Sequence, residues 1–347
     1  MLIISASMGA GHDGVARELA GRLTRDGAQV QVIDVLRLLP LRLGPLLRWW
    51  YRTTVQRTPW IYEIVYQVFF VRRSPVSPLA RLAAPRLRAL TTREAPAHVV
   101  STFHLAAQVT GLMRARGTLT APSTVLVTDF TLHRLWLHPG NDRYLCPTPG
   151  TAHAATAATH RPATAYAPLV RPAFHTRGRP AAARTVLVSA GAWGVGQVTR
   201  TAQVLAASGR YTPVVLCGGN TRLARRLDAA GLGPALGWRD DLPHLMAAAY
   251  ALVDNAAGLT CVEAFAAGLP VVSYRPIPGH GRAGALAMAR AGLTAHAADA
   301  TALLAELDRL ADPRHRARRT AAAGTLFAAP AAETLIRTDD PARTGGA

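Results

Sequence analysis

The first fourteen residues, MLIISASMGAGHDG, constrain the fold more than any other part of the chain. An apolar run leads into a glycine-rich turn, Gly9 to Gly14, then a helical pattern, and a second apolar run ends at Asp34. This order predicts a strand, a glycine turn, a helix and a second strand. Glycines let the backbone approach a ligand closely, and a helix N-terminus favours anionic or electron-rich groups. Because a purely structural turn needs no titratable side chain, His12 inside the turn indicates a chemical site.

The same segment permits two other interpretations. Gly9, Gly11 and Gly14 fit the G-x-G-x-x-G pattern. Asp34 lies about twenty residues further on, where a dinucleotide fold places its ribose-binding carboxylate. A nicotinamide or flavin dehydrogenase is therefore one alternative, and a tight α/β turn without a ligand is another. This segment alone does not decide between them.

Strand and helix patterns alternate in both halves of the chain. The strand patterns fall at 2–7, 29–34, 98–102 and 123–129, and again near 185–190, 213–217, 251–254 and 270–274. Residues 171–184 carry Pro, Gly and Arg without periodicity, which is typical of a linker. The pattern predicts an α/β chain of two Rossmann-like domains facing each other across a cleft. We expect the domains at 1–172 and 184–336, followed by a disordered tail at 337–347.

Composition excludes several classes of protein. The formal net charge is +19, but the chain has no lysine, and its 39 cationic side chains are dispersed arginines without a nucleic-acid motif, so we expect no nucleic-acid partner. Cys146, Cys217 and Cys261 lie far apart, which predicts buried free thiols in a reducing compartment. With no signal pattern at Met1 and no long apolar run, we expect a cytoplasmic protein, peripheral at the inner face of the cell membrane.

Residues 36–73 differ from the rest of the chain. Leucines, the aromatic residues Trp49, Trp50, Tyr51 and Trp60, arginines and three prolines are interleaved there. This mixture is typical of interfacial segments, in which aromatic rings sit at headgroup depth and arginines meet lipid phosphate. Ordinary core helices with solvated arginines are the alternative. We expect the segment to contact an anionic membrane surface.

Six blocks in fixed order resemble one family. They are SASMGAGHDGVA, VTDFTLHRLWLHPGNDRYLC, APLVRPAFH, LVSAGAWGV, VVLCGGNT and NAAGLTCVEAFAAGLPVVSYRPIPG. Together they resemble the processive diacylglycerol glycosyltransferases and the monogalactosyldiacylglycerol synthases, relatives of the peptidoglycan glycosyltransferase that acts on lipid I. The resemblance covers nearly the whole chain. It implies a GT-B fold, with an N-terminal acceptor-binding and membrane-binding domain and a C-terminal domain that binds a nucleotide sugar.

The resemblance assigns donor-binding roles in the second half. The donor candidates are Gly191, Trp193, Gly194, Trp238, Gly258, Leu259, Thr260, Glu263 and His280. Gly191 and Gly258 follow strand patterns, so the backbone there can approach a diphosphate. Glu263 lies in an apolar run and would hold the ribose hydroxyls of a uridine nucleotide, although a surface glutamate is the simpler alternative. No Asp-x-Asp pair is present, so we expect no metal and no cofactor, with helix dipoles stabilising the leaving group.

The acceptor side carries the candidate base. His12 has the neutral-range pKa that suits removal of a proton from an acceptor hydroxyl. Asp129, at the end of a strand pattern, is the second catalytic candidate, either as the base or as the residue that orients His12. The resemblance also assigns Gly9, Gly11, His133 and Trp136 to the acceptor, whereas loop packing would explain His133 and Trp136 equally well.

Two segments depart from the family pattern. Residues 254–258 read DNAAG, so the cation of a Lys-Pro-Gly-Gly type turn is missing. Residues 280–284 read HGRAG in place of sugar-binding Gln-Glu, and Arg282 favours a negatively charged or differently oriented sugar. We expect an inverting, metal-independent transfer from a UDP-sugar to a lipid hydroxyl, most simply that of diacylglycerol. A polyprenyl-linked or natural-product acceptor, or a binding protein without turnover, is the alternative.

Overall fold

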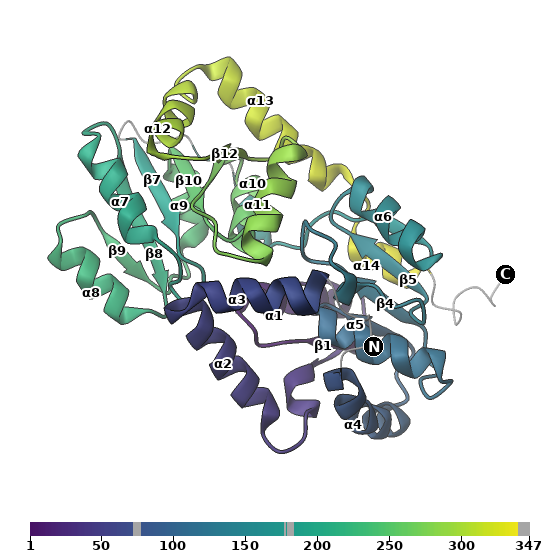
Figure 1. Cartoon of the computed structure of the whole chain (residues 1–347). Coiled ribbons are helices and arrows are strands. Elements are labelled where there is room, and N and C mark those ends of the chain that lie inside the picture. Colours follow the sequence, from purple (N-terminus) through teal and green to yellow (C-terminus); the bar gives the residue numbers. More distant parts are fainter. Residues whose placement is uncertain (72–77, 177, 179–183, 339–347) are drawn as a thin grey trace. The chain divides into compact units, whose positions relative to one another are not determined.

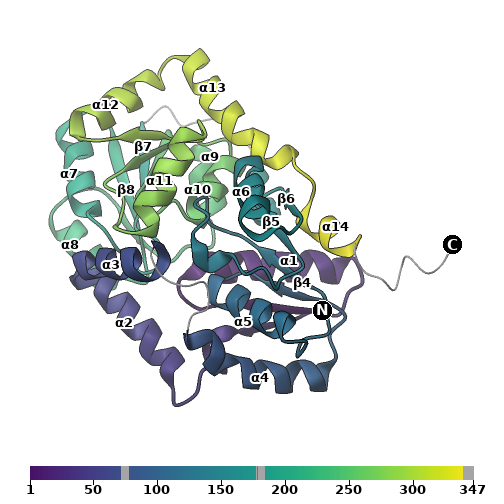
Figure 2. The same ribbon diagram turned by 45° about the vertical axis from the view of Figure 1, so that its right-hand side comes forward.

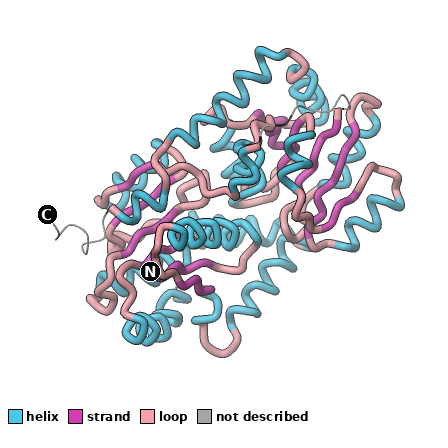
Figure 3. Tube along the Cα trace, turned by 180° about the vertical axis from the view of Figure 1, so that it is seen from behind, coloured by secondary structure: helices cyan, strands magenta, loops and turns pink. Residues whose placement is uncertain are grey.

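The computed structural model describes residues 1–71, 78–176, 178 and 184–338 (Figure 1). The chain forms two compact units. Unit 1 comprises Met1–Tyr51, Ile64–Leu169 and Leu326–Ala347, and unit 2 comprises Arg52–Glu63 and Val170–Thr325. Strands alternate with helices in both units (Figure 3). This alternation confirms the α/β class expected from the sequence.

Unit 1 contains a six-stranded parallel sheet in the order β2-β1-β3-β4-β5-β6. Its strands are β1 (Leu2–Ser5), β2 (Gln31–Asp34), β3 (Val99–Ser101), β4 (Ser123–Leu126), β5 (Arg143–Cys146) and β6 (Ala163–Ala165). The first four were predicted because they are runs of branched apolar residues. β5 and β6 were not, since RYLC and ATA lack such a run.

The helices of unit 1 connect these strands and cover the sheet. They are α1 (Ala10–Arg25), α4 (Pro78–Glu94), α5 (His104–Ala115), α6 (Pro149–Thr159) and α14 (Ala332–Arg337). Short 3₁₀ helices follow β2 at Val35–Leu38 and precede β5 at Arg134–Trp136. The core lies between the sheet and the helices, with Ile4 and Leu87 fully buried on it. The parallel sheet places the ends of β1, β3 and β4 at one edge, which is where His12, His104 and Asp129 follow.

Unit 2 repeats the architecture with the strand order β12-β11-β10-β7-β8-β9. The strands are β7 (Thr185–Ser189), β8 (Thr212–Gly218), β9 (Ala235–Gly237), β10 (Ala251–Asp254), β11 (Val271–Tyr274) and β12 (Ala295–Ala297). The helices are α7 (Val198–Ala207), α8 (Thr221–Ala229), α9 (Leu242–Ala248), α10 (Leu259–Ala266), α11 (His280–Arg290), α12 (Ala300–Arg309) and α13 (Pro313–Gly324). The carboxyl ends of β7, β10 and β11 are adjacent, so the loops that carry the donor candidates share one edge.

Residues 36–71 form α2 (Leu43–Arg57), α3 (Pro59–Val65) and a π-helix, η2 (Tyr66–Val71). Residues 72 and 73 of the expected interfacial segment lie outside the described residues. Leu46, Trp49 and Trp50 have 56%, 62% and 36% of their surface exposed. Their spacing of three and four residues puts them on one face of α2, which we name the α2 apolar face. No helix among the described residues has the length and apolarity needed to cross a membrane.

The units differ from the expected domain ranges at two places. Residues 52–63 pack with unit 2 although they lie early in the chain, and α14 packs with unit 1 (Figure 2). On α14, Glu333 pairs with Arg22 at 3.4 Å and Arg337 with Asp26 at 2.7 Å, both on or next to α1. Ile336 is fully buried. Ionic and apolar contacts thus tie α14 to α1. Arg337, placed in the tail from sequence, ends α14, and residues 339–347 of that tail lie outside the described residues, as does most of the linker after His175.

Two further expectations from the sequence concern the cysteines and the dinucleotide pattern. Cys146, Cys217 and Cys261 are buried free thiols, as predicted. Asp34, the expected ribose ligand of a dinucleotide fold, accepts hydrogen bonds from the Leu36 N–H at 2.9 Å and the Ser7 hydroxyl at 2.6 Å. These bonds give Asp34 a structural role at the end of β2.

Candidate active site

His12 lies on α1 and not in the turn before it. Gly9, with φ +123°, is the N-cap residue, and the helix begins at Ala10. The sequence interpretation placed Gly11, His12 and Gly14 in the turn, and the structure corrects this. A positive φ is adopted readily by glycine, so Gly9 completes the turn and the residues after it become helical. His12 therefore lies in the first helical turn, where the backbone N–H groups have no partner within the helix.

The imidazole of His12 is held in a defined orientation. Its Nδ1 lies 2.9 Å from the Thr128 hydroxyl, and the edge of the Phe103 ring lies against it at a centroid separation of 4.9 Å. Burial lowers the pKa of His12, and this outweighs the opposing effects of the Asp129 and Asp13 carboxylates and the Thr102 backbone. A lowered pKa keeps the imidazole neutral near pH 7, which is the form that accepts a proton.

Asp129 contacts two side chains that the sequence assigned to the acceptor. Its Oδ2 accepts a hydrogen bond from the Trp136 indole N–H at 2.9 Å and lies 3.5 Å from the His133 Nε2. Asp129 affects His12 through its charge, whereas Thr128 makes the hydrogen bond to Nδ1. Three predicted residues are therefore brought together with His12. Trp136 is fully buried and His133 nearly so, and their contacts anchor Asp129.

A shell of rings surrounds this group. His104 lies 4.0 Å from Phe103, 5.2 Å from His133 and 5.2 Å from Phe70, all as centroid separations. Phe70, on the π-helix η2, also lies 5.0 Å from His133. His104, Phe70 and Thr128 were missed from the sequence. Thr128 could have been found as the neighbour of Asp129 at a strand end, but Phe70 carries no local signal.

The loop after β7 is shaped by glycines. Gly191, Gly194 and Gly196 have φ of +63°, +61° and +91°. A Cβ on Gly194 would lie 2.3 Å from that of Asn220, and one on Gly196 would lie 2.1 Å from the Asn255 Nδ2. Larger residues would therefore displace the loop. Trp193, another donor candidate, is half-buried within this turn.

Asn255 links the loops that carry the donor candidates, and it was not predicted as a site residue. Its Nδ2 donates to the Val195 carbonyl at 3.0 Å, and its own carbonyl accepts from the Ile277 N–H at 2.8 Å. The loops after β7, β10 and β11 are thus linked through one side chain and its backbone. Its buried Oδ1 has no hydrogen-bond partner within the described part of the chain.

The N-terminus of α10 carries four of the donor candidates. Gly258 is its N-cap residue, and within the described ranges no side chain caps the helix there. Leu259 and Thr260 form its first turn, so their N–H groups point out of the helix. Glu263 lies one turn further. Burial raises its pKa to about 7, and Arg171 opposes this rise. The carboxyl group is thus poised between its two forms near neutral pH.

Two further donor candidates lie at the rim of unit 2. Trp238 follows β9 and has 64% of its surface exposed. His280 is the first residue of α11, and its Nδ1 lies 2.8 Å from the Tyr62 hydroxyl. Apart from Glu263, which lies one turn into α10, the predicted donor residues lie in loops or helix starts at the carboxyl edge of the unit 2 sheet.

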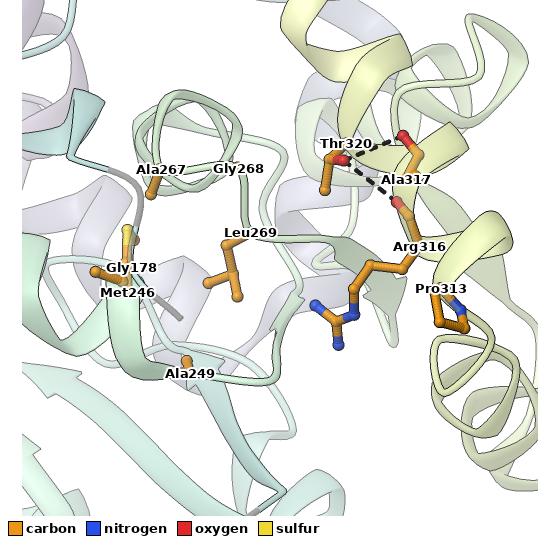
Figure 4. A pocket seen from close by; sticks show the side chains of 11 residues that line it. Gly178, Met246, Ala249, Ala267, Gly268, Leu269, Pro313, Arg316, Ala317 and Thr320 are labelled. Carbon is orange, nitrogen blue, oxygen red and sulfur yellow. Dashed lines mark hydrogen bonds between the residues drawn. The ribbon is translucent and has the colours of Figure 1, made fainter. Parts of the chain in front are cut away.

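A cavity of about 290 Å³ lies elsewhere in unit 2, between α9, α10 and α13 (Figure 4). Leu269 and Met246 line it, and the guanidinium of Arg316 points toward Leu269. Arg316 already donates to the Tyr250 and Leu310 carbonyls, at 2.9 and 3.2 Å. The cavity contains none of the candidate residues, and we assign it no part in the site.

Comparison with known proteins shows which sequences the chain resembles. Residues 12–167 match the family model described as monogalactosyldiacylglycerol (MGDG) synthase. A processive diacylglycerol beta-glucosyltransferase of Bacillus subtilis (strain 168) is 26% identical over 302 residues, which is 80% of this chain and 78% of the relative. The protein of the same name in Bacillus mycoides (strain KBAB4) is 24% identical, covering 89% and 85% of the two chains.

Solved structures show the same fold. MurG of Acinetobacter baumannii superposes with a TM-score of 0.60 at 15% identity, covering 97% of this chain and 99% of MurG. The spinosyn rhamnosyltransferase SpnG gives 0.64 at 13% identity with the same coverage. Anabaena HepE, solved in complex with UDP and glucose, gives 0.58 at 14% identity, covering 100% and 99%.

Two Rossmann-like units, with candidate residues at the carboxyl edges of both sheets, give the chain the GT-B fold of these solved glycosyltransferases. Over most of its length the chain is similar to the diacylglycerol glucosyltransferases, and residues 12–167 match the MGDG synthase family model.

Proposed function

We propose that the protein transfers a sugar from a UDP-sugar to the hydroxyl of diacylglycerol, with inversion and without a metal. The observation that carries the proposal is His12, a neutral imidazole fixed by Thr128 among aromatic rings in the acceptor unit. Such a group can accept a proton but cannot itself form a stable sugar adduct as readily as a carboxylate. A direct displacement with a general base is the mechanism it suits.

In this mechanism His12 takes the proton of the acceptor hydroxyl as the oxygen attacks the anomeric carbon. The bond between that carbon and the diphosphate oxygen breaks, and the nucleoside diphosphate leaves with the electron pair. One displacement inverts the anomeric centre. The open N-terminus of α10 at Gly258 supports the leaving diphosphate through N–H groups and the helix dipole. The Glu263 carboxylate accepts hydrogen bonds that the ribose hydroxyls donate.

Different observations support the choice of a uridine nucleotide and the choice of a lipid acceptor. Relatives are named diacylglycerol glucosyltransferases, and HepE was solved with UDP and glucose. The α2 apolar face exposes two tryptophans and a leucine next to Arg48 and Arg52, as an interfacial helix does. We therefore place the protein peripherally at the inner face of the cell membrane, where diacylglycerol is accessible.

The test is to incubate the protein with a lipid extract and a panel of radiolabelled nucleotide sugars. A labelled glycolipid that comigrates with glycosyldiacylglycerol supports the proposal. Product that forms only with added polyprenyl phosphates or small aglycones would replace the acceptor, and nucleotide binding without product would assign a binding role. Magnesium chelation should leave the rate unchanged, and loss of activity with EDTA would contradict the metal-free mechanism.

A further inference from the structure

Residues 52–63 are part of unit 2 although they come from the N-terminal half of the sequence. Gln56 donates to the Trp193 carbonyl at 2.9 Å, in the loop after β7. Tyr62 and Glu63 reach the loop between β11 and α11. The segment thus contacts two of the loops that carry donor candidates.

Glu63 lies at the N-terminus of α11. Its Oε2 accepts the Gly279 N–H at 2.7 Å and lies 3.5 Å from Nη1 of Arg282. Gly279 is the N-cap residue, with φ +69°, so its own side chain offers no cap. A carboxylate here satisfies one backbone N–H and matches the helix dipole. Because the carboxylate arrives from a residue 216 positions away, the contact is a tertiary feature that local sequence cannot show.

Tyr62 holds His280, the first residue of α11. Its hydroxyl lies 2.8 Å from the His280 Nδ1, and the two rings are perpendicular at a centroid separation of 5.7 Å. Tyr62 is 3% exposed, so packing restricts its rotamer and, through it, the imidazole plane. His280 and Arg282 are both held from one side by one short helix.

The pair also changes the electrostatics of the loop. From sequence alone, Arg282 favours a negatively charged or differently oriented sugar. With Glu63 at 3.5 Å, the guanidinium charge is partly compensated, and the side chain is held toward the carboxylate. The loop after β11 is adjacent to the loop after β10, because β10 and β11 pair directly. A sugar attached to a diphosphate at α10 would extend toward this compensated pair.

We propose that Tyr62 and Glu63 are positioning residues of the donor-sugar site and that they select a neutral hexose over a uronic acid. They act through His280 and Arg282, and the inference rests on the proposed binding of a UDP-sugar in unit 2. Glu63 stands in for the carboxylate that the 280–284 segment lacks.

The test compares the affinities of UDP, UDP-glucose and UDP-glucuronate by calorimetry for wild type, Glu63→Gln, Tyr62→Phe and Glu63→Gln/Arg282→Gln. We expect Glu63→Gln to leave UDP affinity unchanged and to move the glucuronate-to-glucose affinity ratio roughly three- to tenfold toward glucuronate. In the double variant the affinity ratio should return to the wild-type value, because the guanidinium charge that Glu63→Gln leaves uncompensated is then absent. Tyr62→Phe should weaken UDP-glucose but not UDP.

Glu306→Gln is the matched control, because it removes a carboxylate paired with arginine on α12, away from the carboxyl edge of the sheet. Its affinity ratio should equal that of wild type. If wild type binds no UDP, the proposed function fails. If UDP binds but Glu63→Gln keeps the wild-type ratio, or the double variant keeps the gain, the positioning role is overturned. Circular dichroism melts identify any variant that is unfolded, in which case Glu63→Asp replaces Glu63→Gln and should keep most of the wild-type ratio.

Discussion

His12 combines a fixed orientation, a lowered pKa and a position on the first turn of a helix. Removal of a proton from an unactivated alcohol needs a base that is neutral at working pH and that aims one nitrogen at the substrate. Thr128 engages Nδ1 at 2.9 Å, which fixes the plane of the imidazole. In the proposed mechanism the Asp129 carboxylate would stabilise the imidazolium through its charge, which acts to raise the pKa of His12.

His12→Ala should lower turnover by roughly a hundredfold or more with nucleotide affinity unchanged, because general bases contribute about 10²–10⁴. In the wild type, activity should fall as the pH drops through the lowered pKa of His12, since protonation removes the base. Initial rates from pH 5 to 8, together with UDP calorimetry, check both. Turnover like that of wild type in the alanine variant would remove His12 from the mechanism.

Glu263 should make nucleotide binding dependent on pH. Its pKa of about 7 lies above the ordinary carboxyl value, so below pH 7 the group is mostly protonated. Ribose hydroxyls donate to the ionised form, so binding should release a proton and UDP affinity should rise as the pH is raised to about 7, then level off. A raised carboxyl pKa also means that the folded state loses stability as the pH rises through this value.

Calorimetry in buffers of different ionisation enthalpy measures the proton released. Glu263→Gln should bind UDP more weakly by about 2–4 kcal/mol above pH 7, because hydrogen bonds to charged groups contribute roughly 1.5–3 kcal/mol each and are not additive. Its melting temperature should change less with pH than that of wild type. Equal affinities and equal pH dependence would make Glu263 merely structural.

At the scale of elements, α2 has two different ends. Its first half carries the α2 apolar face, and its second half, with α3, contacts the loops of unit 2 that carry the donor candidates. The sequence predicted the interfacial character because clustered tryptophans and arginines are a local signal. It could not predict the second role, because the partners of Tyr62 and Glu63 lie more than two hundred positions away.

The protein should bind anionic vesicles through α2. Each arginine near an anionic surface contributes on the order of 1 kcal/mol, which decreases with salt, whereas buried indole rings contribute a part that salt does not affect. Sedimentation with phosphatidylglycerol vesicles should therefore weaken but persist at high salt. Trp49→Ser/Trp50→Ser should abolish most of the high-salt component.

The matched control is Trp238→Ser, because Trp238 is an exposed tryptophan of unit 2. Trp136 is unsuitable, since it is buried and its indole N–H donates to Asp129. The Trp238→Ser variant should sediment like wild type. If wild type fails to sediment at low salt, the segment does not bind the membrane, and a water-soluble acceptor fits better.

For the whole molecule, the sequence predicted the fold class and most strands, because branched apolar runs and glycine turns are local. It predicted where the candidate residues cluster, since carboxyl ends of parallel strands share an edge. It misplaced the start of α1 by several residues, because helix boundaries depend on backbone angles such as that of Gly9. It also assigned α14 to the wrong half, because its partners Arg22 and Asp26 lie more than three hundred positions away.

The assignment of α14 to unit 1 can be checked by stability. Ile336 is fully buried, so Ile336→Ala should cost about 2–5 kcal/mol of folding free energy. If α14 belongs to unit 1, the loss should appear in urea unfolding while UDP affinity stays as in wild type. Exposed Leu82→Ala, also in unit 1, is the control and should cost little. Loss of UDP affinity in Ile336→Ala would instead tie α14 to unit 2.

The polypeptide passes between the two units four times, near residues 51, 63, 169 and 325. A single splice between residues 169 and 170 would exchange residues 170–325 without residues 52–63. In this molecule such a splice would leave behind the dozen residues that cap α11 and orient His280. A chimera built to test the proposed sugar preference should therefore carry residues 52–63 together with 170–325, which are two separate stretches of the gene.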